Sequence, residues 1–176
     1  GLPYQPDSSI ILLNQTADTM SMEQNDRLDF VRWVEKHKGY HHCEKEHLPR
    51  PWYGEYVREK LEKAIAILKP EVREEYVTDI SLQKDGTFLV SSESNQEQFD
   101  LVHLCIGHLP YLDPYKLIGN ARFIYHPYPV KETLAQIPDE ATIGIIGTGL
   151  TAIDILRFFK HQKRNMNIHF FSDTGT

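Results

Sequence analysis

The sequence predicts an α/β fold, which three stretches of different periodicity indicate. Between residues 26 and 69, apolar side chains recur at the spacing of an α-helix. Between about 72 and 107, short apolar runs flank the turn-forming sequence Lys84-Asp85-Gly86, as in β-structure. From residue 142 onwards, a β-branched run leads through a glycine-rich turn into an amphipathic segment and then a second apolar run. That order is typical of a strand, a helix and a second strand.

The stretch 26–69 is expected to form two helices joined by a polar loop. Asp26 is the expected N-cap of the first helix, with Leu28, Val31 and Val34 on one face. The second helix is expected from about residue 53 to residue 68, before Pro70. Its expected apolar face consists of Tyr53, Val57, Leu61, Ala64, Ile65 and Leu68.

The β-structure of about 72–107 is expected to contain a hairpin and a buried strand. Residues 77–82 form the first hairpin strand, and residues 88–90 return after the turn. Residues 101–106 are mostly apolar, which is typical of a strand covered on both faces. We therefore expect Cys105 to be a buried, unreactive thiol rather than a redox group.

The strongest motif is Gly147-Thr148-Gly149-Leu150-Thr151-Ala152, which follows the run Thr142 to Ile146 at once. It has the form G-x-G-x-x-A, and between a strand and a helix it is the fingerprint of a Rossmann dinucleotide-binding unit. Gly147 permits the tight turn, Gly149 leaves room for a pyrophosphate, and the small Ala152 lets helix and strand approach. The helix N-terminus offers N–H groups and partial positive charge to phosphates. All six residues are therefore candidate cofactor-binding residues; the competing interpretation is a glycine turn that only packs the helix on the sheet.

Two polar residues at the end of the second strand are candidates for recognising the ribose. Asp173 could bind the 2′-hydroxyl of NAD, although it lies a few residues later than the fingerprint requires. Ser172 could instead face the 2′-phosphate of NADP. A plain polar turn is the third interpretation, so the choice between NAD and NADP stays open.

Composition narrows the classes of partner. The 176 residues carry a net charge of −6 and no basic stripe with interleaved aromatic residues, so nucleic acid is not an expected partner. No apolar run approaches the roughly 20 residues that cross a bilayer. The two cysteines, Cys43 and Cys105, have no pairing pattern, which favours a reducing cytoplasm.

A loop rich in histidine is the one place where a metal site is conceivable. It contains His37, His41, His42, Cys43 and His47. Their spacing matches no closed zinc motif, and the charged residues between them indicate a solvated loop. No metal is therefore expected.

Four short motifs occur in a fixed order along nearly the whole chain. They are Gly1-Leu2-Pro3-Tyr4 with Leu12-Leu13-Asn14 and Met20-Ser21, Pro49-Arg50 with Tyr53-Gly54-Glu55-Tyr56, Phe99-Asp100-Leu101 through Cys105-Ile106-Gly107, and Ile145 to Asp154 around the fingerprint. In this order the chain resembles the FAD-NAD(P)-binding family of two-dinucleotide flavoproteins, which are related to flavin-containing and N-hydroxylating monooxygenases.

The resemblance implies a division into domains. Residues 1–107 would be part of an FAD-binding-type domain with a helical insert at about 26–69, residues 108–141 a connection, and residues 142–176 the start of an NAD(P)-binding Rossmann domain. The family's first G-x-G-x-x-G, which grips the FAD pyrophosphate, would precede Gly1, so the chain resembles an internal fragment. Cys105-Ile106 also replaces the family's Ala-Thr. We therefore expect these 176 residues alone to retain no FAD and to be inactive.

The resemblance also implies candidate contacts to the flavin nucleotide. They are Asn14, Arg50 and Gly107. Alternatively, Arg50 forms a surface ion pair with a nearby glutamate, and Asn14 only turns the chain. Asp154 is expected to cap or pair locally, without a catalytic role.

Two functions fit these features. In the first, the parent protein is an oxidoreductase that passes hydride from NAD(P)H to FAD and then electrons to O₂ or another acceptor. In the second, the chain is a dinucleotide-binding module with a sensing or scaffolding role and no turnover. No catalytic residue is assigned, because in flavin enzymes the cofactor carries the chemistry.

Overall fold

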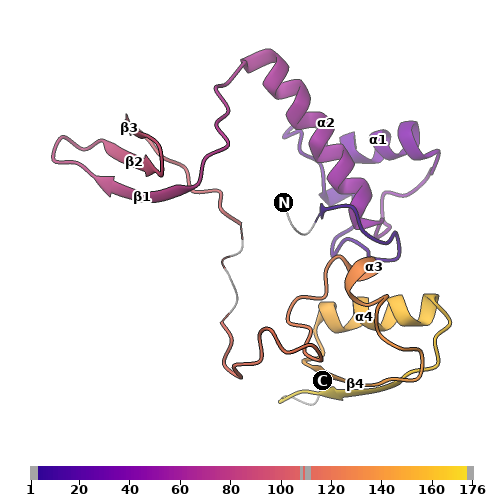
Figure 1. Ribbon diagram of the computed structural model, residues 1–176. Coiled ribbons are helices and arrows are strands. Elements are labelled where there is room, and N and C mark those ends of the chain that lie inside the picture. The colour runs from indigo at the N-terminus through magenta and orange to yellow at the C-terminus, as the bar shows by residue number, and fades with distance from the viewer. Residues whose placement is uncertain (1–3, 108, 110–111, 174–176) are drawn as a thin grey trace. The chain divides into compact units, whose positions relative to one another are not determined.

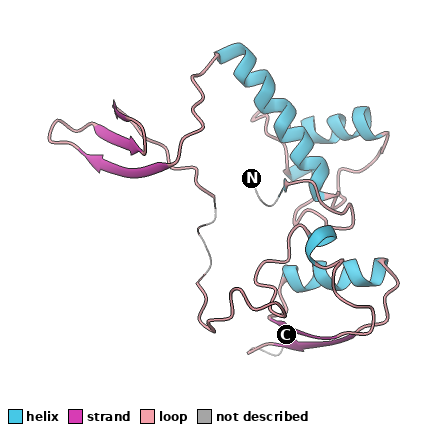
Figure 2. Cartoon of the chain, viewed as in Figure 1, coloured by secondary structure: helices cyan, strands magenta, loops and turns pink. Residues whose placement is uncertain are grey.

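The computed structural model describes residues 4–107, 109 and 112–173. The chain divides into two compact units, one of Gly1–Lys63 with Asp113–Thr176 and the other of Ala64–Leu112. Figure 1 labels most of their helices and strands, and Figure 2 separates the two kinds of element by colour. The start of the first resemblance motif, residues 1–3, and the expected last residues of the Rossmann domain, 174–176, lie outside the described residues. Helices and strands together confirm the α/β class.

Two helices form the first half of the larger unit, as the periodicity predicted. Helix α1 spans Asp29–Lys38, and α2 spans Arg50–Leu68. The predicted N-cap Asp26 is wrong: Leu28 occupies the cap position, while the Asp26 carboxylate accepts the Leu28 N–H and pairs with Arg32. The second helix begins three residues earlier than predicted, because Pro51 is compatible with a first helical turn.

The core between α1 and α2 buries fewer side chains of the second helix than predicted. Its fully buried side chains include Phe30, Val34 and Tyr56, of which Tyr56 was not on the predicted face. The outer residues of that face, Leu61, Ile65 and Leu68, are exposed. The apolar spacing of α2 therefore continues into its last turns, where the described core does not bury the side chains.

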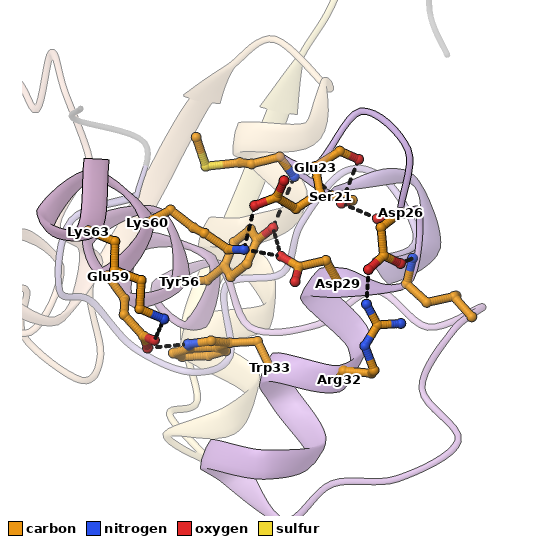
Figure 3. A network of polar contacts seen from close by, with 12 residues as sticks. Ser21, Glu23, Asp26, Asp29, Arg32, Trp33, Tyr56, Glu59, Lys60 and Lys63 are labelled. Atoms are coloured by element: carbon orange, nitrogen blue, oxygen red, sulfur yellow. Dashed lines mark hydrogen bonds and ion pairs between the residues drawn. The ribbon is translucent and has the colours of Figure 1, made fainter. Parts of the chain in front are cut away.

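Polar contacts close the edge of the α1–α2 pair (Figure 3). The Tyr56 hydroxyl donates to Asp29 at 2.6 Å and accepts the Met22 N–H at 3.0 Å. Lys60 lies 2.7 Å from Asp29 and completes a charge pair there. Burial raises the pKa of Tyr56, and the Asp29 carboxylate raises it further, so the hydroxyl keeps its proton as the donor.

One segment near the N-terminus contributes to both cores of the larger unit. Leu13 packs into the α1–α2 core, whereas Ile11 packs into a second core with Val130, Leu134, Phe158 and Phe159. In a regular strand Ile11 and Leu13, two positions apart, would share a face. They reach different cores because this segment is irregular, with a turn and a bend just before the isolated bridge between Leu12 and Pro49. The Asp7 carboxylate adds a polar tie, because it accepts the N–H groups of Val130 and Lys131 at 2.9 and 3.2 Å. These two residues open the short helix α3, Val130–Thr133.

The C-terminal part of the larger unit is the predicted strand–helix–strand. Strand β4 spans Thr142–Ile146, helix α4 spans Leu150–His161, and strand β5 spans Asn167–Phe171. The two strands are parallel, with Thr142 opposite Asn167 and Ile146 opposite Phe171. This arrangement confirms the prediction and brings the ends of both strands to one edge.

The smaller unit is a three-stranded antiparallel sheet in the order β1-β2-β3. Strands β1, Val77–Leu82, and β2, Phe88–Ser92, form the predicted hairpin, and Gly86 takes the positive φ of +90° that its turn requires. Strand β3, Gln96–Phe99, was not predicted because its sequence is polar.

The predicted buried strand at 101–106 is wrong. These residues form no strand, and Leu101, Leu104 and Ile106 are each about two-thirds exposed. Cys105 is likewise exposed rather than buried. The physical reason is the lack of a pairing partner, because no described strand runs beside this segment. The β-structure expected over about 72–107 therefore occupies only 77–99.

Candidate functional site

The glycine turn between β4 and α4 leaves open space above the helix N-terminus. Gly147 has a φ of +96°, and its N–H donates to the Phe171 carbonyl at 2.7 Å, which ties the turn to β5. Gly149 is the N-cap, and a Cβ built on either glycine would meet no other atom within 4 Å. Gly147 thus takes a backbone conformation that favours glycine, and open space lies beside Gly149 at the start of the helix.

The remaining fingerprint residues occupy the first turn of α4. Leu150 and Thr151 are exposed at its first two positions. The third, Ala152, is buried, and its N–H donates to the Gly149 carbonyl at 2.9 Å. Because the first N–H groups of a helix have no partner within it, these groups can donate to phosphate oxygens.

The candidate ribose-binding residues lie at the same edge. Ser172 and Asp173 directly follow β5, whose last residue pairs with the last residue of β4. The Thr148 hydroxyl donates to the Ser172 hydroxyl at 3.4 Å. The structure therefore brings Ser172 beside the fingerprint turn, with the exposed Asp173 next to it.

Arg50 lies at the centre of a second cluster, made of polar side chains, to which the fingerprint helix α4 contributes Asp154. Its Nη2 atom donates to the Leu12 carbonyl at 3.0 Å and to Asn14 Oδ1 at 3.4 Å. The same atom lies 3.2 Å from Asp154 Oδ2, and the two side chains are only 13% and 9% exposed. The expected alternative, a surface pair with a nearby glutamate, is therefore wrong. Asp154 likewise pairs across the fold, not locally.

Tyr128 completes this cluster and was missed by the sequence analysis. Its hydroxyl donates to Asp154 Oδ2 at 2.5 Å, and the Arg50 guanidinium lies 5.5 Å from the centre of its ring. Burial and the hydrogen bond to Asp154 raise the pKa of Tyr128, so it remains a donor. Tyr128 lies in a Pro/Tyr-rich connection without periodicity, so no local signal marked it.

The third candidate flavin contact, Gly107, belongs to the smaller unit. It has a φ of +69° and follows an exposed segment rather than the strand that was predicted. The structure brings Asn14 and Arg50 together in the larger unit. Gly107 belongs to the unit Ala64–Leu112.

The histidines of the expected loop make contacts within the protein. His37 lies in helix α1 and not in a loop, and it stacks on Trp33 with ring centres 4.7 Å apart. His47 Nδ1 lies 2.9 Å from the Leu13 carbonyl, 34 positions away in the sequence. Burial raises the pKa of the Cys43 thiol, which keeps it protonated. Within the described ranges, no three His, Cys, Asp or Glu side chains are placed to hold a metal ion.

Comparison with known protein families gives one match. Residues 1–109, more than half of the chain, match the family described as FAD-NAD(P)-binding. The chain belongs to this family. None of the curated proteins and none of the solved structures compared with it matches.

Membership of the FAD-NAD(P)-binding family supports a flavoprotein of oxidoreductase type whose partners are flavin and nicotinamide dinucleotides. The matched region ends before the fingerprint turn, so the turn is an independent observation that agrees with the family. None of the helices in the described part of the chain is long and apolar enough to cross a membrane.

Proposed function

We propose that the turn between β4 and α4 binds the pyrophosphate of NADH or NADPH in an FAD-dependent oxidoreductase. The observation that carries this proposal is the open space at Gly149, directly above the N-terminus of a twelve-residue helix. Gly147, Thr148, Gly149, Leu150, Thr151 and Ala152 would surround the phosphates, and Ser172 or Asp173 would face the ribose. The nicotinamide and the flavin would supply the redox chemistry, from hydride transfer to the reduction of O₂ or another acceptor.

The flavin side of the proposal rests on family membership and on the pair Asn14–Arg50. The sequence contains a single G-x-G-x-x-A motif, at Gly147, and we assign that motif to the nicotinamide dinucleotide. Gly107 stays a proposed flavin contact on the basis of the resemblance. The proposed domain division at residues 107 and 142 rests on the same resemblance. The expected cytoplasmic location rests on the lack of a pairing pattern for the two cysteines.

The test of this site is Gly149→Val in the full-length protein. The new side chain would enter open space, so folding should be unaffected, while the pyrophosphate would be displaced from the helix N–H groups. Loss of about two charge-assisted hydrogen bonds, each worth about 1.5–3 kcal/mol, predicts an affinity that is at least about 100-fold lower. Calorimetric titration with NADP⁺ and NAD⁺ measures it.

Lys160→Ala is the matched control, because Lys160 is exposed at the opposite end of the same helix. Its dinucleotide affinity should equal that of the wild type. If Gly149→Val binds both dinucleotides as tightly as the wild type does, the turn only packs the helix on the sheet.

A non-catalytic binding module is the second candidate function. It is favoured by the single dinucleotide fingerprint in this sequence. The two candidates differ in whether full-length protein carries flavin that NAD(P)H can reduce.

A further inference from the structure

The fingerprint helix carries a buried negative charge close to the end that would receive phosphates. Asp154 is the fifth residue of α4, counted from Leu150, and is 7% exposed. At 1.5 Å per residue, it lies about 7.5 Å along the axis from the N-cap Gly149. That separation is within the Debye length of about 8 Å at physiological ionic strength, so salt screens the interaction only in part. Alone, this carboxylate would oppose the binding of a pyrophosphate.

Arg50 places a positive charge next to the Asp154 carboxylate. Its Nη2 atom lies 3.2 Å from Asp154 Oδ2, and both side chains are largely buried. The Tyr128 hydroxyl donates to the same oxygen at 2.5 Å. Asp154 therefore receives one cationic and one neutral donor, which come from two segments outside its own helix.

Arg50 is itself fixed by groups that do not belong to α4. It donates to the Leu12 carbonyl at 3.0 Å and to Asn14 Oδ1 at 3.4 Å, and it lies at the first position of α2. A guanidinium held in this way offers its charge at a defined place, unlike a flexible surface lysine.

We propose that Arg50 is a positioning residue for the nicotinamide dinucleotide: by neutralising Asp154, it keeps the N-terminus of α4 attractive to the pyrophosphate. This inference rests on the proposed function and deepens it, because Arg50 acts on the dinucleotide through Asp154 without touching it. The role is separate from the flavin contact that the family resemblance implies for Arg50. This role would explain why the pair is buried, because a buried ion pair often adds little to the stability of a fold.

The proposal predicts an affinity loss that Asp154→Asn rescues and that shrinks at high ionic strength, and a purely structural ion pair would not give this salt dependence. Arg50→Gln leaves Asp154 unneutralised and should weaken binding of NADP⁺ and NAD⁺ about tenfold at low salt. Adding Asp154→Asn removes the opposing charge, so the double variant should bind within about twofold of the wild type. Raising ionic strength from about 0.05 M to about 0.5 M should shrink the defect of Arg50→Gln.

Calorimetric titration of the full-length variants measures these affinities, with flavin content and far-ultraviolet circular dichroism recorded in parallel. Arg157→Gln is the matched control, because Arg157 also joins α4 to the N-terminal segment, through the Ile10 carbonyl, but is exposed. Its affinity should be unchanged. If Arg50→Gln does not fold, Tyr128→Phe replaces it, with a smaller loss in the same direction that Asp154→Asn again reverses.

The result that would overturn the proposal is a double variant that binds as weakly as Arg50→Gln, or an Arg50→Gln protein with wild-type affinity. Failure of the proposed function looks different: Gly149→Val would then bind as the wild type does, or the wild type would bind neither dinucleotide.

Discussion

Gly54 illustrates how a single residue records a close approach of two segments. It lies inside α2, where glycine usually weakens a helix by roughly 0.5–1 kcal/mol relative to alanine. A Cβ at this position would lie 1.9 Å from the Tyr4 carbonyl oxygen, which is a severe overlap with backbone. The glycine of the Tyr53-Gly54-Glu55-Tyr56 motif is thus required by packing against the N-terminal segment.

We expect Gly54→Ala to destabilise the fold by about 1–3 kcal/mol, although alanine is the better helix former. The sign of the change in unfolding free energy therefore shows whether overlap with the Tyr4 backbone or the higher helix propensity of alanine dominates. Urea unfolding measures it, and Arg58→Ala, an exposed position on the same helix, should change stability by less than about 0.5 kcal/mol. A more stable Gly54→Ala protein would contradict the close approach.

Cys105 and Tyr128 show where residue-level prediction from sequence stops. The burial of Cys105 was inferred from apolar neighbours, but burial depends on a partner strand that local sequence does not specify. Tyr128 acquires its role from Asp154, 26 positions away, and from Arg50, further still. Contacts of this kind arise from tertiary packing, so neither periodicity nor a motif indicates them.

At the scale of elements, the α1–α2 pair depends on carboxylates that must stay ionised (Figure 3). Lys63 and Trp33 donate to Glu59 and lower its pKa from the ordinary 4.5 to about 2. Burial alone would raise the pKa of Asp29, but hydrogen bonds from Lys60 and Tyr56 outweigh it and lower that pKa below 3.8. Between its folded-state and its unfolded-state pKa, each carboxylate therefore binds fewer protons in the folded protein than in the unfolded chain.

This linkage predicts acid sensitivity with a defined window. A depressed folded-state pKa contributes stability that is fully present above the unfolded value and lost as pH falls towards the folded value. The contribution of Glu59 should therefore be lost between pH 4.5 and about 2. Urea midpoints measured across that window should fall less steeply for Glu59→Gln than for the wild type. The same slope in both proteins would contradict the role of Glu59, and Glu62→Gln, an exposed neighbour, is the control.

The elements with strong local signals were predictable, and those without them were not. Strand β4, the glycine turn and helix α4 follow directly from a β-branched run, Gly147 and an amphipathic period. The hairpin of β1 and β2 follows from its Asp85-Gly86 turn. Strand β3 has the polar sequence Gln96–Phe99, and its pairing with β2 depends on the neighbouring strand rather than on its own pattern. The start of α2 was misplaced because Pro51 reads as a boundary but serves as part of the first turn.

At the scale of the whole molecule, membership of the FAD-NAD(P)-binding family and the fingerprint turn are two separate lines of support for one function. The family match covers residues 1–109, and the turn lies beyond it at 147–152. Within the larger unit, Arg50 and Asp154 join the matched region to the fingerprint helix by a buried ion pair.

The most direct test of the proposed oxidoreductase is anaerobic titration of the full-length protein with NADPH and with NADH, followed by flavin absorbance. We expect the protein to purify with bound flavin, and at least one nicotinamide dinucleotide to bleach its absorbance band. The Gly149→Val protein should keep its flavin but require far more NAD(P)H for bleaching. A full-length protein whose flavin neither dinucleotide reduces, or one that binds dinucleotide without any flavin, would contradict the oxidoreductase and favour a binding module.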